Sequence, residues 1–167
     1  MQKQTEVPEI VPDVPFGLEI GLRNYWLPIL RSEELPEGEP VGLSLLGEDL
    51  VIWRDSQGKP CVVNDRCPHR NARFKMGRVL DGQIQCALHG LRFDGQGRCV
   101  LIPWEPEDSK LLAELSIAGY PAEELGGYVW AYIGDSVEFP PPPLADEVPE
   151  ELTDQENFIC FRLPTAI

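Results

Sequence analysis

The hydrophobic and polar positions of residues 41–65 fall into short, regularly spaced runs. Three apolar runs are separated by turn-forming residues at 47–49 and 55–58, and their sequences are VGLSLLG, DLVIWRD and KPCVVND. Runs of this length, bounded by glycine, aspartate and serine, are typical of strands joined by tight turns. The pattern therefore predicts three consecutive β-strands.

The same pattern returns in two later segments. RVLDGQIQC, residues 78–86, has a short apolar run on either side of Asp81-Gly82, and LRFDGQGRCVLIP, residues 91–103, repeats the arrangement around a DGQG turn. The pair Asp-Gly favours the positive φ angles that a tight hairpin turn requires. Two β-hairpins are therefore expected.

Residues 114–134 predict two more strands, of which 128–133 is apolar on both faces, as in the core strand of a sandwich. The one helical candidate is the segment 105–115, and its proline and its charges count against a helix. Many short strands at short spacing predict an all-β fold, an antiparallel β-sandwich or barrel.

The two ends of the chain differ in composition from this central part. Residues 1–22 are rich in proline and glutamate without periodicity, which predicts an extended N-terminal arm. Residues 136–157 contain four consecutive prolines and an acidic run, which is typical of a stiff, solvated linker. Residues 158–167 resemble a strand without a partner, so we expect a further domain to follow it.

Charge narrows the range of partners. The chain has 28 acidic and 14 basic residues, a formal net charge of −14. Because this charge repels phosphate backbones and anionic lipid, neither nucleic acid nor a membrane is an expected partner. The charge keeps a protein soluble, and it can also steer the chain toward a basic partner.

Two further features of the sequence concern the cellular compartment and the role of the cysteines. The N-terminus lacks the basic and apolar regions of a secretory signal, and the chain has no apolar run of the length that crosses a membrane. We therefore expect a cytoplasmic protein. Its five cysteines are an odd number, which argues against a disulfide framework and for thiolate or metal chemistry.

Both histidines of the chain lie close to a cysteine, in the pattern C-x-H-x16-C-x2-H formed by Cys67, His69, Cys86 and His89. Each half follows a predicted strand, where a loop can present side chains from a rigid base. Chance placement rarely gathers every histidine in this way, so we interpret the four residues as metal ligands. Tetrahedral zinc accepts such ligands, but zinc fingers usually group the cysteines together and the histidines together. One cysteine and one histidine per loop better suit a two-iron cluster.

These segments resemble the Rieske [2Fe–2S] proteins, whose two cluster loops correspond to CPHR and CALHG. The resemblance extends from YWLPI to GGYVWAYIG, about residues 24–135, and is strongest with the N-terminal domain of phthalate- and vanillate-type Rieske non-haem iron oxygenases. It implies a Rieske-type β-sandwich over 23–135, with a small inserted subdomain made of the two loops. It also implies that the cysteines ligate the inner iron and the histidines the outer, exposed one.

Two positions depart from the oxygenase pattern, which commonly has glycine where Asn71 stands and tryptophan where Leu91 stands. The respiratory and photosynthetic Rieske proteins also bridge their loops by a disulfide, at positions that here are Ala72 and Leu88, and place a serine hydroxyl at the position of Leu91. Fewer hydrogen-bond donors to the cluster sulfurs predict a lower reduction potential. The charge of −14 is expected to act in the same direction, because it disfavours the addition of an electron.

The remaining cysteines and the tryptophans are interpreted as structural. Free cysteine is among the most frequently buried residue types, and tryptophan is mostly buried as well. We therefore expect core or lid positions, without a functional role, for Cys61, Cys99, Cys160, Trp26, Trp53, Trp104 and Trp130.

The histidine count limits the chemistry of these residues. In the oxygenases that the chain resembles, a second domain holds a mononuclear Fe(II) in a 2-His-1-carboxylate triad, whereas both histidines here are already assigned. We therefore expect no catalytic residue in this chain, which alone would transfer electrons only. The favoured hypothesis is the Rieske domain of a ring-hydroxylating or demethylating oxygenase, an oxidoreductase, with its mononuclear iron in a missing or separate catalytic domain.

Two other hypotheses stay open at this point. One is a self-contained Rieske ferredoxin, and the other is a metal-stabilised binding module without a redox role. The expected partners are an electron-donating reductase or ferredoxin and the oxygenase catalytic domain, for which a homotrimer is one arrangement that the resemblance allows. The linker and the strand after it favour the oxygenase domain over the ferredoxin, because a ferredoxin has no need of them.

Overall fold

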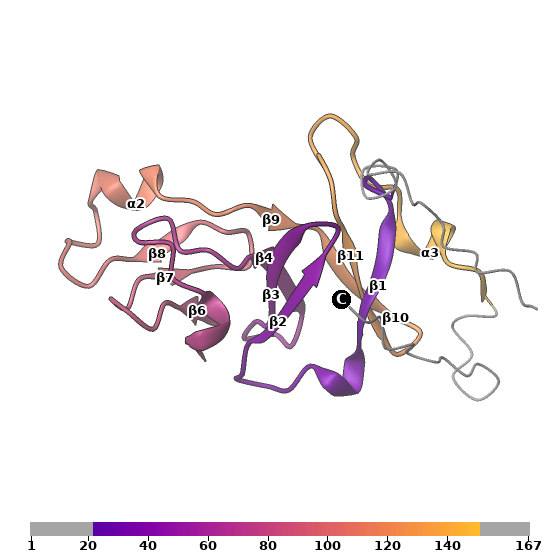
Figure 1. Ribbon diagram of the computed structural model, residues 1–167, viewed down its shortest axis with the longest axis horizontal. Helices are drawn as coiled ribbons and strands as arrows, with labels where there is room; N and C mark the ends of the chain where they lie inside the picture. The colour runs from indigo at the N-terminus through magenta and orange to yellow at the C-terminus, as the bar shows by residue number, and fades with distance from the viewer. Residues whose placement is uncertain (1–21, 151–167) are drawn as a thin grey trace, which may run out of the picture.

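Three antiparallel sheets form the structure, which is a computed structural model that describes residues 22–150. Figure 1 shows the third sheet and α2 at the left, the second sheet in the middle and the first sheet at the right. The predicted all-β, antiparallel fold is confirmed. The predicted arm (1–22, apart from Leu22) and the predicted strand 158–167 lie outside the described residues.

Each sheet contains three or four strands. The first sheet has the order β1-β11-β10, with β1 (Trp26–Arg31), β10 (Ala122–Leu125) and β11 (Tyr128–Tyr132). The second has the order β2-β3-β4-β9, with β2 (Val41–Leu45), β3 (Glu48–Arg54), β4 (Pro60–Asn64) and β9 (Gly119–Tyr120). The third has the order β5-β6-β7-β8, with β5 (Arg78–Leu80), β6 (Gln83–Gln85), β7 (Arg92–Phe93) and β8 (Cys99–Leu101).

The second sheet is buried on both faces. Leu50 and Ile52 of β3 pack against the first sheet, in a cluster that includes Val129 and Ala131. The side chains between them point the other way, because successive residues of a strand face opposite sides. Val51 and Trp53 accordingly pack in a second cluster with the residues around the third sheet. This two-sided burial explains why the sequence of β3 is a continuous apolar run.

The turn between β2 and β3 lies earlier than the sequence pattern predicted. Leu46 and Gly47 form it with φ angles of 49° and 76°, and β3 already begins at Glu48. Two successive residues with positive φ are the geometry of a two-residue hairpin whose twist matches its strands. The other predicted hairpin turn, Asp81-Gly82, lies where it was expected, with φ angles of 53° and 75°.

Residues 114–134 contain three strands, so the prediction of two was wrong. Pro121 separates β9 from β10, and the two strands belong to different sheets: β9 pairs with β4, and β10 pairs with β11. Because proline cannot donate a backbone hydrogen bond, a strand that changes sheets at this residue loses no bond there. The predicted core strand at 128–133 is confirmed as β11, in which 129–132 are all buried.

The helices of the described residues are short. The candidate segment 105–115 contains one helical turn, α2 (Lys110–Glu114), which begins after Ser109, whose hydroxyl oxygen accepts a hydrogen bond from the Leu111 N–H at 3.3 Å. The others are α3 (Leu144–Glu147) and the 3-10 helices η1 (Ser32–Glu34) and η2 (Phe74–Met76). No helix among residues 22–150 is long and apolar enough to cross a membrane.

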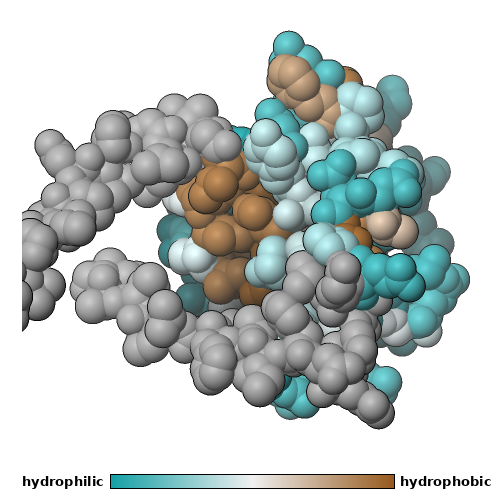
Figure 2. All heavy atoms as spheres, turned by 90° about the vertical axis from the view of Figure 1, so that its right-hand side faces the viewer, coloured by the Kyte–Doolittle hydropathy of each residue, from teal (hydrophilic) through white to brown (hydrophobic). Residues whose placement is uncertain are grey.

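Part of the predicted linker 136–157 packs against the first sheet. Leu144 and Val148 are buried in a cluster with Trp26 and Trp130. The Trp26 indole N–H donates a hydrogen bond of 2.8 Å to a carbonyl of this segment, that of Pro142. This contact departs from the solvated linker that its composition predicted, because the few apolar residues of the segment find an apolar surface. Figure 2, which views this end of the molecule, shows a hydrophobic area among hydrophilic residues.

Close backbone approach fixes the third sheet on the second. The Trp53 indole N–H, in a fully buried side chain, donates a hydrogen bond of 2.9 Å to the Gly82 carbonyl in the β5–β6 turn. A Cβ on Gly82 would collide with the Ser56 backbone, and one on Gly95 would collide with the Cys61 sulfur. Glycine is therefore required where the third sheet meets the second.

Replacing Trp53 by phenylalanine should lower the free energy of unfolding by about 2–3 kcal/mol, because the change removes buried volume and leaves the Gly82 carbonyl without its donor. Amide exchange in β5 and β6 should accelerate, since the hairpin loses its anchor. Denaturant unfolding and hydrogen exchange measure both effects.

The matched control is Trp26→Phe, which also removes an indole hydrogen bond but at the opposite end of the molecule. Its effect on exchange should be confined to the segment around α3. Faster exchange in β5 and β6 in the Trp26 variant, or unchanged exchange there in the Trp53 variant, would contradict the role given to the Trp53–Gly82 bond.

Candidate metal centre

Two loops of the same construction carry the four predicted ligands. In the first loop, which follows β4, the Cys67 N–H donates to the Ala72 carbonyl at 2.9 Å, and the Asn71 N–H donates to the Cys67 carbonyl at 2.8 Å. These two bonds join Cys67 to the residues four and five positions after it. The loop is thus closed by its own backbone, and the residues between Cys67 and Asn71 form an exposed tip.

The second loop, between β6 and β7, repeats these two bonds. The Cys86 N–H donates to the Leu91 carbonyl at 2.9 Å, and the Gly90 N–H donates to the Cys86 carbonyl at 3.0 Å. The Gln85 side chain also donates to the Gly90 carbonyl, at 3.3 Å. The two loops therefore present their cysteines from equivalent positions.

The equivalence explains the asparagine at position 71. Asn71 and Gly90 occupy the same place in the two loops, and both have positive φ angles, 57° and 77°. Asparagine is among the few residues other than glycine that adopt this left-handed conformation readily. The departure from glycine at this position therefore leaves the backbone of the first loop unchanged.

The structure brings the four predicted residues together in two pairs, buried cysteines and exposed histidines. Cys67 and Cys86 are each 2% exposed and belong to the same buried cluster, whereas His69 and His89 are exposed. The two imidazole rings lie side by side, with centroids 4.6 Å apart and planes at 65°. A pair of buried thiols and a pair of exposed imidazoles, one of each per loop, can hold a metal group between the loops.

Electrostatics indicates that this site needs a cation. Burial and, to a smaller extent, the neighbouring Cys86 raise the pKa of Cys67 to about 11, although backbone N–H groups of the loop partly oppose the effect. Without a cation, the Cys67 thiol therefore stays protonated at neutral pH. A bound metal deprotonates a coordinating thiol because its charge offsets the cost of burying a thiolate. The donor set therefore fits a metal group with positive charge between the sulfurs.

The arrangement differs from a mononuclear site. Within residues 22–150, no three or more histidine, cysteine, aspartate or glutamate side chains gather so that they could hold one metal ion together. A two-iron cluster has a different requirement, because each iron takes two protein ligands and inorganic sulfide supplies the others. The pair of cysteines and the pair of histidines meet that requirement, because each pair can supply the two protein ligands of one iron.

Trp104, which the sequence analysis assigned to the core or a lid, contacts both histidines. Its side chain is 55% exposed, and its ring centroid lies 5.5 Å from that of His69 and 6.3 Å from that of His89. The preceding Pro103 lies against Gly90, where an added Cβ would be 3.3 Å from the proline ring. The sequence shows no signal of this position, because Trp104 simply ends an apolar run.

The other tryptophans and two of the cysteines follow the prediction. Trp26, Trp53, Trp130, Cys61 and Cys99 are all buried. Cys160 lies outside the described residues. Four cysteines, Cys61, Cys67, Cys86 and Cys99, have free thiols.

A buried acid beneath the first loop was missed by the sequence analysis. Asp65 is 1% exposed, and its carboxylate accepts hydrogen bonds from the Lys75 N–H at 2.9 Å and from Arg73 at 3.4 Å. Arg73 also pairs with Asp49 of β3 at 2.8 Å and, together with the Ser44 hydroxyl, lowers the pKa of that carboxyl. The network ties the base of the first loop to the second sheet. An aspartate beside several arginines was the only signal in the sequence.

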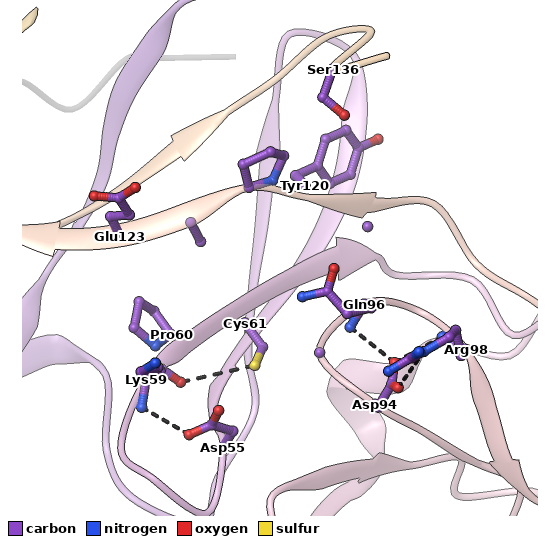
Figure 3. Close-up of a pocket in the computed structure, with 14 residues that line it drawn as sticks. Asp55, Lys59, Pro60, Cys61, Asp94, Gln96, Arg98, Tyr120, Glu123 and Ser136 are labelled. Atoms are coloured by element: carbon purple, nitrogen blue, oxygen red, sulfur yellow. Dashed lines mark hydrogen bonds and ion pairs between the residues drawn. The ribbon is translucent and has the colours of Figure 1, made fainter. Parts of the chain in front are cut away.

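A hollow elsewhere in the molecule contains none of the predicted ligands. It has a volume of about 520 Å³ and lies where the turns after β3 and β7 meet the β9–β10 segment (Figure 3). Its lining includes Cys61, whose pKa is raised to about 12 by burial and by the carboxylates of Asp55 and Asp94. A thiol with so high a pKa is a poor nucleophile at neutral pH. Cys61 is therefore not a candidate for a catalytic nucleophile.

Comparison with known proteins agrees with this geometry. Residues 25–121, more than half of the chain, match the Rieske [2Fe–2S] domain. The chain is 39% identical to the 3-chlorobenzoate-3,4-dioxygenase oxygenase subunit of Comamonas testosteroni, over 84% of this chain and 33% of that protein. It is 38% identical to the phthalate 4,5-dioxygenase oxygenase subunit of Pseudomonas putida, over 80% and 31%.

A solved structure of the oxygenase and ferredoxin complex of carbazole 1,9a-dioxygenase also matches. The TM-score is 0.65 at 31% identity, and the match covers 81% of this chain and 34% of that chain. The chain thus spans about a third of the length of the curated relatives described above.

The left-handed backbone at position 71 gives a direct test of the loop geometry. Asn71→Gly should change the free energy of unfolding by less than about 0.5 kcal/mol, whereas Asn71→Val should lower it by about 1–2 kcal/mol, because a β-branched side chain is strained at this φ. Iron bound per chain should stay the same in the glycine variant and fall in the valine variant. Equal losses in both variants would show that the asparagine side chain, rather than its backbone conformation, supports the loop.

Proposed function

The chain belongs to the Rieske [2Fe–2S] domain family, and from this premise we propose that it is the electron-transfer domain of an aromatic-ring-hydroxylating or demethylating oxygenase. The observation that carries the proposal is the pair of matching loops, each presenting one buried cysteine and one exposed histidine. Its strongest support outside the site is the 39% identity to an oxygenase subunit rather than to a free-standing carrier.

In the proposed site, Cys67 and Cys86 hold the inner iron, and His69 and His89 hold the outer one. The burial of both cysteines supports this assignment, as does the exposure of both histidines. When bound, such a cluster accepts and releases one electron. The protein's own contribution is to exclude water from the sulfur side, where Phe74 is fully buried in the cluster of residues that contains both cysteines.

The exposed imidazole edges are the proposed route for the electron. They lie at the surface with the Trp104 ring against them, whereas the sulfurs lie behind the loops. A redox partner can therefore approach the histidine side more closely than any other side. We propose that electrons both enter and leave through this edge.

Substrate oxidation is proposed to take place outside these 167 residues. The sequence contains two histidines, and both are assigned to the cluster, so neither is free for a mononuclear iron triad. The proposed partners are therefore a reductase or ferredoxin as donor and an oxygenase catalytic domain as acceptor, within an assembly that a homotrimer would satisfy. A cytoplasmic location belongs to the proposal, since the four described cysteines are unpaired thiols, as in reducing compartments.

The proposed function is tested first by cluster content. The purified chain should contain about two irons and two acid-labile sulfides, show a red-brown colour, and lose visible absorption when it takes up one electron from dithionite. Cys67→Ser and Cys86→Ser should each abolish the cluster, and the loss of the cluster should loosen the two loops that it joins.

The control for this experiment is Cys99→Ser, which alters a buried cysteine of the third sheet that lies outside the proposed ligand set. It should retain iron and colour. Stoichiometric zinc without visible absorption in the unmodified chain would contradict the proposal.

The reduction potential provides a second test. Leu91 is buried, and its carbonyl accepts the hydrogen bond from the Cys86 N–H, but its side chain has no hydroxyl to offer to the cluster sulfurs. Fewer donors leave the added electron less stabilised, so the midpoint should lie near the lower end of the range of about −150 to +300 mV for Rieske centres.

The matched variants are Leu91→Ser and Leu91→Ala, which create similar cavities but differ in the hydroxyl. The serine variant should have the higher potential of the two by voltammetry. A midpoint well above zero in the unmodified chain, or equal shifts in both variants, would show that hydrogen-bond donors at this position do not set the potential.

A further inference from the structure

The charge of the chain is unevenly distributed. Residues 66–92, which include both loops, contain six basic residues and one acid, Asp81, a local net charge of +5. The other 140 residues contain the remaining eight basic and 27 acidic residues, a net charge of −19. A strongly acidic protein therefore has one positively charged segment that contains both loops.

Three of these cations are exposed and have no carboxylate partner among residues 22–150. They are Arg70, Lys75 and Arg78. By contrast, Arg66 and Arg73 pair with Asp49, and Arg92 pairs with Asp81. Unpaired cations keep their full attraction for an anionic partner.

Two of the unpaired cations lie directly beside the loops. Arg70 follows His69 in the first loop. Arg78 lies opposite Gln85 in the β5–β6 pair and donates a hydrogen bond of 2.7 Å to its side chain, which in turn donates to the Gly90 carbonyl of the second loop. Positive charge thus borders both loops.

Apolar side chains lie next to the histidines. Leu88, next to His89, is 61% exposed, Pro68, next to His69, is also exposed, and Trp104 covers part of both imidazoles. We call the surface made by these residues the docking face: Pro68, His69, Arg70, Arg78, Leu88, His89 and Trp104. An apolar centre with a charged rim is the usual composition of a protein-binding surface.

We propose that the docking face binds the acidic face of the electron-donating redox protein. This inference rests on the proposed function, and it adds the charge of the partner and the residues that recognise it. The observation that selects such a partner is the position of the exposed, unpaired cations Arg70 and Arg78 beside the two loops, in a segment of formal charge +5 within a chain of net charge −14. Interactions between exposed charges are screened over about 8 Å at physiological ionic strength, so a docked partner responds to the rim rather than to the distant acids.

Acidic residues also lie close in the chain to the docking face. Glu107 and Asp108 follow Trp104 in the chain and are exposed. An acidic partner is therefore attracted on the side of the two loops and repelled on the side of residues 107–108. Such asymmetry orients a partner as well as attracting it.

The experiment uses a reduced plant-type [2Fe–2S] ferredoxin, a strongly acidic protein whose potential lies below those of Rieske centres, as the donor. Stopped-flow absorption measures the second-order rate of electron transfer to the oxidised, cluster-loaded chain at low and high salt. Two proteins that meet only as net negative charges react faster as salt increases. The docking face predicts the opposite sign, with the rate falling about tenfold between about 20 mM and about 500 mM NaCl.

Variants then locate the interaction. Arg70→Gln and Arg78→Gln should each lower the low-salt rate about 2–5-fold and flatten its salt dependence, whereas Glu107→Gln should raise the rate. The control is Lys59→Gln, an exposed cation on the turn after β3, which should leave the rate unchanged. Iron content and reduction by dithionite are checked for each variant, so that damage to the cluster is not mistaken for lost docking.

The outcomes separate this inference from the proposed function. A chain that contains the cluster and is reduced by dithionite, but whose rate with ferredoxin rises with salt, retains the function and overturns the docking face. Equal effects of the Lys59 and Arg70 variants would overturn it as well. Salt-sensitive self-association in sedimentation experiments, abolished by Arg70→Gln, would assign the face to a second copy of the chain and overturn the choice of partner.

Discussion

The burial of the second sheet on both faces is the constraint on which the rest of the structure depends. Leu50 and Ile52 face the first sheet, while Val51 and Trp53 face the third, so the β3 strand joins two cores that would each be small alone. The candidate site lies in the loops that follow β4 of the second sheet and β6 of the third. Its loops are held in place by the Trp53–Gly82 hydrogen bond and by the contacts of Asp65 and Arg73 with the second sheet. The exposed loops can thus be rigid because their supports are buried.

The sequence predicted the fold class and most strands because both follow from local patterns. Apolar runs with turn residues between them correctly indicated β2, β3 and β4, and Asp81-Gly82 correctly indicated the β5–β6 hairpin. The assignment of strands to sheets depends on long-range pairing, which those patterns do not encode. The division at Pro121 and the packing of Leu144 on the first sheet were missed for this reason. Both features depend on contacts between residues that are far apart in the sequence.

For the site, the sequence predicted the residues with a chemical signature. Cysteine and histidine at close spacing are rare enough to be noticed, and the structure pairs the two cysteines with each other and the two histidines with each other. Trp104 has no such signature, because an aromatic residue at the end of an apolar run is usually structural. Its position against both imidazoles comes from the turn at residues 102–105 and from the contact of Pro103 with Gly90. Supporting residues of this kind are found from contacts rather than from composition.

The structure changes the interpretation of the net charge, because it shows which charges lie near the site. The value of −14 predicted a lower reduction potential and allowed steering toward a basic partner, yet residues 66–92, which contain both loops, have a formal charge of +5. Coulomb energy decreases with distance and is screened by salt, so the exposed arginines beside the loops outweigh acids farther away. They act against the effect of the missing hydroxyl at Leu91, which lowers the potential. The hydrogen-bonding groups at the sulfurs and the charges at the rim can therefore be adjusted separately, the first for potential and the second for partner choice.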